Sequence, residues 1–295
     1  MTWVTLALLT YFLWACTNIG EKYLVANKIS RPVAYLLLGF WTGSLAILVF
    51  PFLHFTWPDA KTAAFLFGAA VLYFAGAYLY VRTLQIEEIS RINLWWNAMP
   101  LFSLLIAWLI LEENLTIKQL AAFAIIMVGV ILASIHVRGA KLTLSRGGLF
   151  MLVACFLFSA HDVIVRQVTR TVPYGDVFLT IAISLLLLSF LPLFDKRVRL
   201  QVAATFKEIS WRTIFLLAGI NVVIKLGILT HSWAISLGPV ALVNALEGFQ
   251  SVFVFVLAFL LSWMFPRVIK EETDRRNLIL KIIALAMMIV GVILV

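Results

Sequence analysis

The stretch Val128-Gly129-Val130-Ile131-Leu132 occurs a second time, as Val290-Gly291-Val292-Ile293-Leu294, and each copy lies near the end of an apolar segment. Prolines repeat in the same way: two that are nineteen residues apart flank one apolar segment in each half, first Pro32 and Pro51, then Pro173 and Pro192. Signals that recur in the same order indicate that one structural unit is present twice. We therefore predict a first repeat at residues 1–138, a linker at 139–146 and a second repeat at 147–295.

The composition indicates the class of protein. Hydrophobic residues make up 63% of the 295 residues and charged residues only 13%, which is far from a soluble domain of this length. Apolar runs of about 18 to 25 residues are long enough to cross the hydrocarbon core of a bilayer as helices. Ten such runs lie near residues 2–20, 33–53, 62–81, 89–111, 117–136, 147–167, 175–194, 212–231, 238–264 and 277–295.

Five helices in each repeat is an odd number, so the second repeat enters the membrane from the opposite side to the first. The predicted fold class is an all-α integral membrane protein with ten transmembrane helices arranged as two inverted five-helix repeats. Inverted repeats let one body open alternately to the two sides around a central site, as alternating-access transport requires. A duplication that only stabilises a helix bundle, and a channel or membrane enzyme built from repeats, are the alternatives.

The distribution of Lys and Arg predicts the orientation in the membrane. Seventeen of the 23 Lys and Arg residues lie in the connecting segments 21–31, 82–91, 138–146, 196–212 and 267–276. The opposite segments contain only Lys61, Lys118, Arg166 and Arg170. By the positive-inside rule the first set faces the cytoplasm and both termini lie outside, in a multi-pass protein of the cell (inner) membrane. The net charge of +9 therefore needs no nucleic acid partner.

Motifs of common enzymes are missing from the sequence. No Walker loop, dinucleotide fingerprint, HExxH sequence or serine-hydrolase elbow occurs, so we predict neither an ATP-driven pump nor an enzyme, and no cofactor or bound metal. Cys16 and Cys155 lie inside predicted helices at positions that do not correspond under the repeat, which favours packing roles over a disulfide.

Several motifs together resemble a known family. They are Trp14-Ala15 followed by Lys22, Pro100-Leu101-Phe102, Leu109-Ile110-Leu111-Glu112-Glu113-Asn114-Leu115-Thr116, and Gly129-Val130-Ile131-Leu132. With this pattern the chain resembles the ten-helix members of the drug/metabolite transporter superfamily, the EamA-like permeases. The resemblance implies secondary transport of a small metabolite, with export as its direction. The second half departs from the pattern, because Ser251 stands where the first half has Pro100 and no Glu-x-x-Thr turn precedes the last helix.

Two charged residues are predicted to lie deep in the membrane. Glu247 follows the start of the segment 238–264 by about ten residues, or roughly 15 Å of helix, and Lys225 lies at a similar depth in 212–231. A charge at this depth costs at least about 2.5 kcal/mol, so both side chains are expected to face the protein interior, a partner or water. They form either a structural salt bridge or a functional site, in which Glu247 carries a proton or Lys225 holds an anionic substrate.

Polar residues at helical spacing extend this predicted binding site. Asn221 lies four residues before Lys225, and Asn244 and Ser251 share one stripe with Glu247. We expect the two stripes to line one cavity. The candidates in the first repeat are Asn18, Asn93, Trp96, Asn97 and Trp14. Amides and indole rings suit recognition of a small asymmetric solute, although tryptophans in membrane proteins also serve as interfacial anchors.

His161 and Asp162 lie about fifteen residues into the segment 147–167 and correspond to Thr17 and Asn18 of the first repeat. Adjacent residues do not share one helical face, which argues against a common metal ion. Both are candidates for proton coupling together with Glu247, and a hydrogen-bonded packing role is the alternative. The other histidines, His54, His136 and His231, are predicted to lie at helix ends.

The sequence thus predicts a secondary transporter that moves an amino acid, a sugar or a related organic solute, driven by protons or by the gradient of the solute. The alternative is a non-transporting membrane protein, such as a lipid-handling enzyme or a scaffold. The GxxxG pattern from Gly39 to Gly43 permits close helix contact, which we expect within the chain. The expected partners are the small-molecule substrate and the lipid bilayer, with the chain a monomer or a homodimer.

Overall fold

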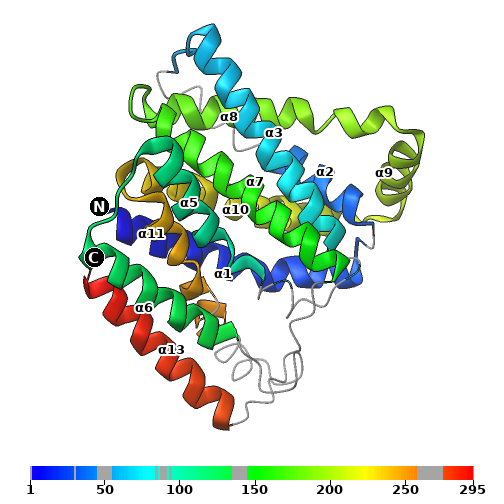
Figure 1. Ribbon diagram of the computed structural model, residues 1–295. Helices are drawn as coiled ribbons and strands as arrows, with labels where there is room; N and C mark the ends of the chain where they lie inside the picture. The colour runs from blue at the N-terminus through cyan, green and yellow to red at the C-terminus, as the bar shows by residue number, and fades with distance from the viewer. Residues whose placement is uncertain are drawn as a thin grey trace.

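The computed structural model describes residues 2–29, 31–44, 55–83, 86, 92, 95–134, 145–250, 252–254, 256–257 and 275–294, and every regular element in these ranges is helical (Figure 1). The first half contributes α1 (Trp3–Asn27), α2 (Pro32–Gly43), α3 (Ala60–Thr83), α5 (Met99–Leu111) and α6 (Ile117–Ser134). The second half contributes α7 (Arg146–Val168), α8 (Tyr174–Leu188), the 3₁₀ helix η2 (Leu191–Phe194), α9 (Lys196–Glu208), α10 (Trp211–Leu237), α11 (Val240–Ala245) and α13 (Arg275–Leu294).

Four helical segments of the described residues are long and apolar enough to cross a membrane: Ala60–Thr83, Arg146–Val168, Tyr174–Phe194 and Trp211–Leu237. Shorter apolar helices lie at Trp3–Asn18, Pro32–Gly43, Met99–Leu111, Ile117–Leu132, Val240–Val254 and Ile282–Leu294. The all-helical membrane fold is therefore confirmed, and helix is found in each of the ten predicted apolar runs. The number of segments that cross the bilayer stays a prediction.

Polar side chains fix several helix ends. Ser145 accepts a hydrogen bond from the amide of Gly148 (3.0 Å) at the start of α7, which satisfies one of the free donors of the first turn. The left-handed conformation of Glu112, with φ of 53°, ends α5. Thr116 and Gln119 then form a reciprocal capping box for α6, because each side chain accepts from the amide of the other residue at 3.3 Å and 2.9 Å.

Helices from the two halves make the largest contacts. These are α3 with α7, α6 with α13, and α1 with α10, and α6 and α13 lie side by side along one edge of the molecule (Figure 1). In addition α3 packs on α8, and α10 packs on α2. If α1 corresponds to α7, α2 to α8 and α3 to α10, then each of these contacts has an equivalent in the other half.

The duplicated pentapeptide lies at the contact between α6 and α13. A Cβ atom on Gly129 would lie 2.9 Å from the carbonyl oxygen of Ala284, and one on Gly291 would lie 3.1 Å from that of Ala122. Each glycine thus faces the carbonyl group seven residues before the other glycine. The close approach of the two backbones explains why both copies contain glycine at this point.

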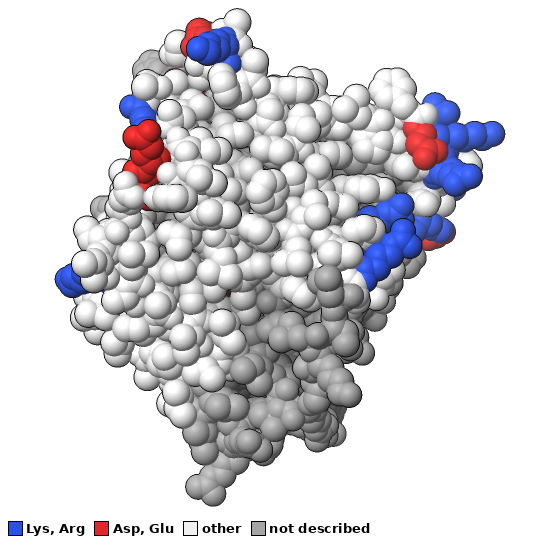
Figure 2. Space-filling model, viewed as in Figure 1, with Lys and Arg blue, Asp and Glu red and all other residues white. Residues whose placement is uncertain are grey.

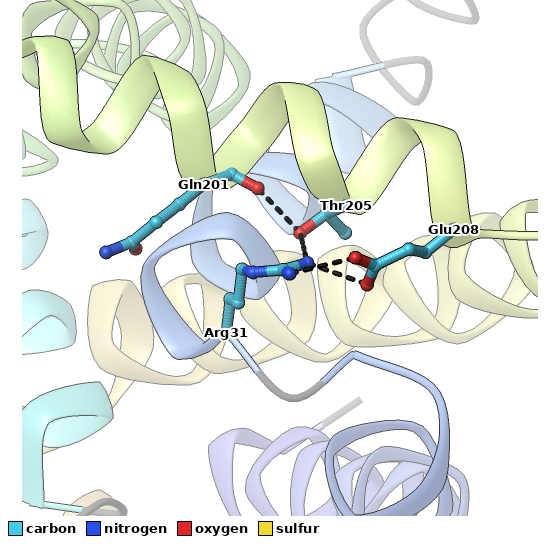
Figure 3. Close-up of polar contacts among 4 residues, drawn as sticks. All are labelled: Arg31, Gln201, Thr205 and Glu208. Carbon is cyan, nitrogen blue, oxygen red and sulfur yellow. Dashed lines mark hydrogen bonds and ion pairs between the residues drawn. The ribbon is translucent and has the colours of Figure 1, made fainter.

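The segment 196–212, predicted only as a connection, contains the helix α9. Its N-terminal residue is capped by Asp195, which accepts from the amide of Arg197 at 2.7 Å. The guanidinium of Arg31 donates to both carboxylate oxygens of Glu208 at 2.8 and 2.9 Å and to the hydroxyl of Thr205 at 3.3 Å, and so ties α9 to the start of α2 (Figure 3). This bond lowers the pKa of Glu208 below its usual value and raises the pKa of Arg31.

Basic side chains gather at the end of the molecule that α9 occupies (Figures 1 and 2). Lys196, Arg197, Arg199 and Lys207 of α9 are all exposed, whereas most of the remaining visible surface is uncharged (Figure 2). Both chain termini lie at the opposite side in Figure 1. This arrangement is compatible with the predicted orientation, in which α9 faces the cytoplasm and the termini face outside.

Candidate functional site

The segment that contains Glu247 is a broken helix. The α-helix α11 covers only Val240–Ala245 and is followed by a turn at Leu246 and Glu247, after which residues 248–250 are helical again. The amide of Glu247 donates to the carbonyl of Asn244 at 3.1 Å, and that of Gln250 donates to Glu247 at 2.8 Å. These bonds span three residues and not four, which marks a tightened turn of the kind often found at functional hinges.

Asn244, at the end of α11, is the centre of a buried polar network. Its side chain is fully buried, and its amide nitrogen donates to the hydroxyl of Ser103 at 2.7 Å and to a carboxylate oxygen of Asp162 at 2.9 Å. Its amide oxygen lies 3.0 Å from Nε2 of His231. One side chain therefore connects α5, α7, α10 and α11. Buried polar groups without partners are costly, so this network stabilises one particular packing of the four helices.

The network continues through two serines into α5. Ser103 donates to the hydroxyl of Ser159 at 3.0 Å, and Ser159 donates in turn to the carbonyl of Met99 at 2.9 Å. Met99 is the first residue of α5, so its carbonyl lies next to the turn at residues 97–98. The hydrogen bonds thus run from the break after α11 to the turn that precedes α5.

Glu247 lies at the edge of this network. Its carboxylate is half-buried and within electrostatic range of Asp162, and also of the phenol groups of Tyr11 and Tyr80. The described residues provide no ion pair between Glu247 and Lys225. Two carboxylates in one interior region, without a neighbouring cation from the described residues, make a site whose charge depends on bound protons or on a solute.

Aromatic rings surround the network on two sides. Trp14 and Tyr11 of α1 pack against the ring of His231, with centroid distances of 5.3 and 6.1 Å, and the hydroxyl of Tyr11 donates to the carbonyl of Val243 at 3.0 Å. On the other side Trp96 stacks on Phe158 with a centroid distance of 5.5 Å. Trp14 and Trp96 are both half-buried, and their rings pack against rings of α10 and α7.

His161 and Asp162 point to different neighbours, as their adjacent positions predicted. Nδ1 of His161 lies 2.9 Å from the carbonyl of Ala69 in α3, and its ring packs on Tyr73, whereas Asp162 faces Asn244. Among the described residues no group of three or more His, Cys, Asp or Glu side chains is arranged to hold a metal ion.

Lys225 and Asn221 lie apart from the Asn244 network. They line the face of α10 that packs on α2, where a Cβ atom on Gly43 would lie 2.6 Å from Cε of Lys225, and one on Gly39 would lie 3.2 Å from Oδ1 of Asn221. The predicted GxxxG pattern thus accommodates the predicted polar stripe of α10. The two stripes of the second half face different neighbours, α2 for α10 and α5 with α7 for α11.

Of the remaining predicted site residues, two lie in the described part of the chain and two lie outside it. Asn18 and Asn97 are half-buried in the described chain. Asn93 and Ser251, together with His54 and His136, lie outside the described residues.

Sequence reasoning missed several members of the network: His231, Ser103, Ser159 and Tyr11. The prediction that His231 lies at a helix end is wrong, because α10 extends to Leu237 and the imidazole is buried against Asn244. Ser103 and Ser159 could have been found as single hydroxyl residues in otherwise apolar helices, since such groups need a partner in a bilayer.

Comparison with protein families finds a match for nearly half of the chain. Residues 1–135 match the EamA-like transporter family. The resemblance noted in the sequence is thereby confirmed over this half, which ends close to the predicted boundary of the first repeat. The matched family is described as one of transporters, and the apolar helices agree with a multi-pass membrane protein.

Solved structures with a similar fold cover nearly the whole chain. Twenty-nine chains match, and one of them, described as a "crystal structure of protein", superposes with a TM-score of 0.69 at 13% sequence identity. The match covers 99% of this chain and 94% of that chain. No curated protein matches the sequence.

Proposed function

We propose that this chain is a secondary transporter of ten transmembrane helices in two inverted five-helix repeats, which moves a small organic solute by alternating access. The observation that carries the proposal is the break after α11, because interrupted helices at mid-membrane form the solute and ion sites of many transporters. A second interruption, at residues 97–98, precedes α5, and the amide of Ala98 donates to the carbonyl of Trp95 at 3.0 Å. If Pro100 corresponds to Ser251, the turn at residues 97–98 lies two residues after the position equivalent to the turn at 246–247.

The interior carboxylates support a coupling role for protons. Asp162 is held by Asn244, and Glu247 lies at the helix break within electrostatic range of Asp162. Two ionised carboxylates in a site of low dielectric constant are costly. Uptake or release of one proton by Asp162 or Glu247 therefore changes the stability of the hydrogen-bonded network around Asn244. We assign Glu247 and Asp162 the coupling role, with His161 as a neighbouring proton acceptor, and we expect Asn244, Trp14 and Trp96 to contact the solute.

The scaffold alternative is disfavoured by the position of Lys225. A purely structural pair would bring Lys225 against Glu247 in a dry interior, whereas Lys225 packs against Phe40 and Gly43 of α2. The solute class that we propose is an amino acid, a sugar or a related organic compound, with export as the direction that family membership favours. In the same proposal the chain is a monomer or homodimer of the cell membrane with both termini outside.

Reconstitution into liposomes tests the proposal. Purified protein is placed in vesicles that contain a pH-sensitive dye, and pools of amino acids, sugars and organic acids are added under an imposed proton gradient. We expect at least one pool to cause a proton flux that empty vesicles lack. Glu247→Gln should abolish this flux and keep the exchange of labelled for unlabelled solute, while Glu208→Gln, which removes an exposed carboxylate, should change neither. If wild-type vesicles show neither flux nor exchange with any pool, the proposal fails.

A further inference from the structure

The helix α9 connects two segments that are long and apolar enough to cross a bilayer. The first, Tyr174–Phe194, ends just before α9, and the second, Trp211–Leu237, begins shortly after it. In Figure 1 α9 runs crosswise at the end of α8. A helix between two spans that does not continue either of them is placed at the boundary between water and hydrocarbon, with its axis along the membrane surface.

Aromatic rings near both ends of α9 agree with this position. Phe194 precedes the helix with 83% of its surface exposed, and Trp211 follows it with 66% exposed. A third ring, that of Trp41 in α2, stacks on Phe206 of α9 with a centroid distance of 6.4 Å. Tryptophan is enriched at membrane–water interfaces, where its apolar ring and its polar N–H meet different surroundings. The rings therefore support an interfacial position for α9.

One face of α9 is docked on the protein and the opposite face is open. Val198 and Val202 pack in an apolar cluster with residues of α2, and the bond between Arg31 and Glu208 holds the C-terminal end of the helix (Figure 3). The residues of the open face are all exposed: Lys196, Arg199, Leu200, Ala203, Phe206 and Lys207.

The open face combines positive charge with apolar side chains. Leu200 lies four residues after Lys196 and seven before Lys207, and Phe206 lies seven residues after Arg199, so charged and apolar groups share the same lines along the helix. Leu200 is 60% exposed and Phe206 is 50% exposed. This mixture is typical of helices that lie in the headgroup layer of a membrane.

Positive charge is in excess around α9. From residue 195 to residue 212, five residues are basic and two are acidic. Both acidic groups are engaged within the protein, because Asp195 accepts from the amide of Arg197 and Glu208 accepts from Arg31. The five basic residues are exposed: Lys196, Arg197, Arg199, Lys207 and Arg212. Figure 2 shows basic side chains gathered at this end of the molecule.

We propose that the open face of α9 binds the phosphate groups of anionic phospholipids, and that these lipids fix the helix at the bilayer surface. Lys and Arg donate charge-assisted hydrogen bonds to phosphate, while Leu200 and Phe206 reach toward the acyl chains. A nucleic acid would meet the charges and leave the apolar side chains in water, whereas a lipid layer matches both. The inference depends on a membrane position and not on transport.

Hydrogen exchange in nanodiscs tests the inference. The full-length protein is compared in phosphatidylcholine alone and in phosphatidylcholine mixed with phosphatidylglycerol. Exchange of α9 amides is measured relative to amides in the first turn of α6, because a negative surface lowers the local pH for all exposed amides. We expect phosphatidylglycerol to slow the α9 amides about tenfold to hundredfold, at about fivefold for each basic residue that meets a headgroup. About 0.5 M NaCl should remove most of the effect.

Two charge variants of equal size separate α9 from the rest of the surface. The triple variant Lys196→Gln, Arg199→Gln and Lys207→Gln should lose the slowing by phosphatidylglycerol. The matched control Lys61→Gln, Lys118→Gln and Arg170→Gln also removes three exposed basic residues, and should keep the slowing. The charge-preserving variant Lys196→Arg and Lys207→Arg should keep it as well. In phosphatidylcholine alone all of these proteins should exchange α9 amides like the wild type, since the docked face is unchanged.

Several outcomes would overturn the inference. One is equal exchange of wild-type α9 in the two kinds of nanodisc, and another is equal slowing in the triple glutamine variant. Inorganic phosphate that slows exchange in phosphatidylcholine nanodiscs as much as the lipid does would assign the surface to a soluble anion. Markedly faster exchange of the triple variant in phosphatidylcholine alone would show that the three charges act within the protein. Binding of the lipid without transport of any solute would leave this inference standing and contradict the proposed function.

Discussion

Asn244 is the residue on which the interior polar network depends. Asn244→Ala removes the partner of Ser103, Asp162 and His231 at once. We expect the free energy of unfolding to fall by about 2–4 kcal/mol, because several buried groups lose their hydrogen bonds together. Unfolding in mixed micelles measures the change. Asn114→Ala is the matched control, since Asn114 is exposed and its amide donates only to the carbonyl of Glu112; an equal loss in both variants would contradict the central role of Asn244.

At the residue scale, the sequence indicates which side chains need a buried partner but not which partner they find. Asn244, Glu247 and Asp162 stand out because they are polar groups in apolar runs, and the structure places them together. Helical spacing also predicts that Asn221 and Lys225 share one face of α10. Spacing does not determine which helix covers that face. The stripes of Lys225 and of Asn244 were expected to line one cavity, but they face different helices.

Glycine positions decide how closely α6 and α13 approach. Gly129→Ala would place a methyl group about 3 Å from a backbone oxygen and a side-chain carbon that belong to the opposite helix. We expect a loss of about 1–3 kcal/mol in the free energy of unfolding, since a backbone carbonyl cannot rotate away. Gly68→Ala in α3 meets open space, and should be neutral or slightly stabilising because alanine favours helix. A similar effect of both variants in thermal unfolding would show that the contact tolerates a methyl group.

The contact between α2 and α9 should depend on pH. Because Arg31 holds the pKa of Glu208 below the usual value of 4.5, the bridge stabilises the docked helix fully at a pH above that value. Its contribution is lost as the pH falls through the lowered pKa of Glu208. Hydrogen exchange of α9 amides should therefore speed up, relative to its intrinsic rate, as the pH falls below 4.5, and Glu208→Gln should remove this dependence. An unchanged pH profile in the variant would indicate that another group controls the docking of α9.

Element boundaries illustrate why sequence reasoning succeeds for long apolar segments and fails for short amphipathic ones. The runs 62–81, 147–167 and 212–231 lie within α3, α7 and α10, because only a helix satisfies every backbone group in a bilayer. The helix α9 was missed because its basic residues were interpreted only as a signal of orientation. Its docking depends on Thr205 and Glu208 meeting Arg31, which is 177 residues from Glu208 in the chain.

For the whole molecule, the predicted repeat pairs helix contacts of one half with equivalent contacts of the other half. The sequence alone could not show these contacts. The packing of α1 on α10 has its equivalent in α7 on α3, and the two glycines of the repeated pentapeptide face each other's helices in the same way. In the proposed alternating-access cycle, pseudo-symmetric contacts of this kind would allow one packing that opens to each side of the membrane. The match to the EamA-like family covers residues 1–135, and the second half has Ser251 where the first half has Pro100.

The proposed inverted topology makes a prediction for the entire chain. Single cysteines are introduced at Arg199 in α9 and at Lys61 and Lys118, the second residues of α3 and α6, in a background without Cys16 and Cys155. Seventeen of the 23 basic residues lie in segments that the ten-helix prediction puts on one side, and the positive-inside rule then predicts that Arg199→Cys lies in the cytoplasm. An impermeant maleimide should label Lys61→Cys and Lys118→Cys in intact cells and Arg199→Cys only after the cells are opened. Labelling of all three in intact cells would be incompatible with the orientation, because α9 and these two positions would then share one side. Two predicted transmembrane helices, 62–81 and 89–111, lie between Lys61 and Lys118, so the two residues should be on the same side of the membrane. Labelling of only one of Lys61→Cys and Lys118→Cys would contradict this number of helices.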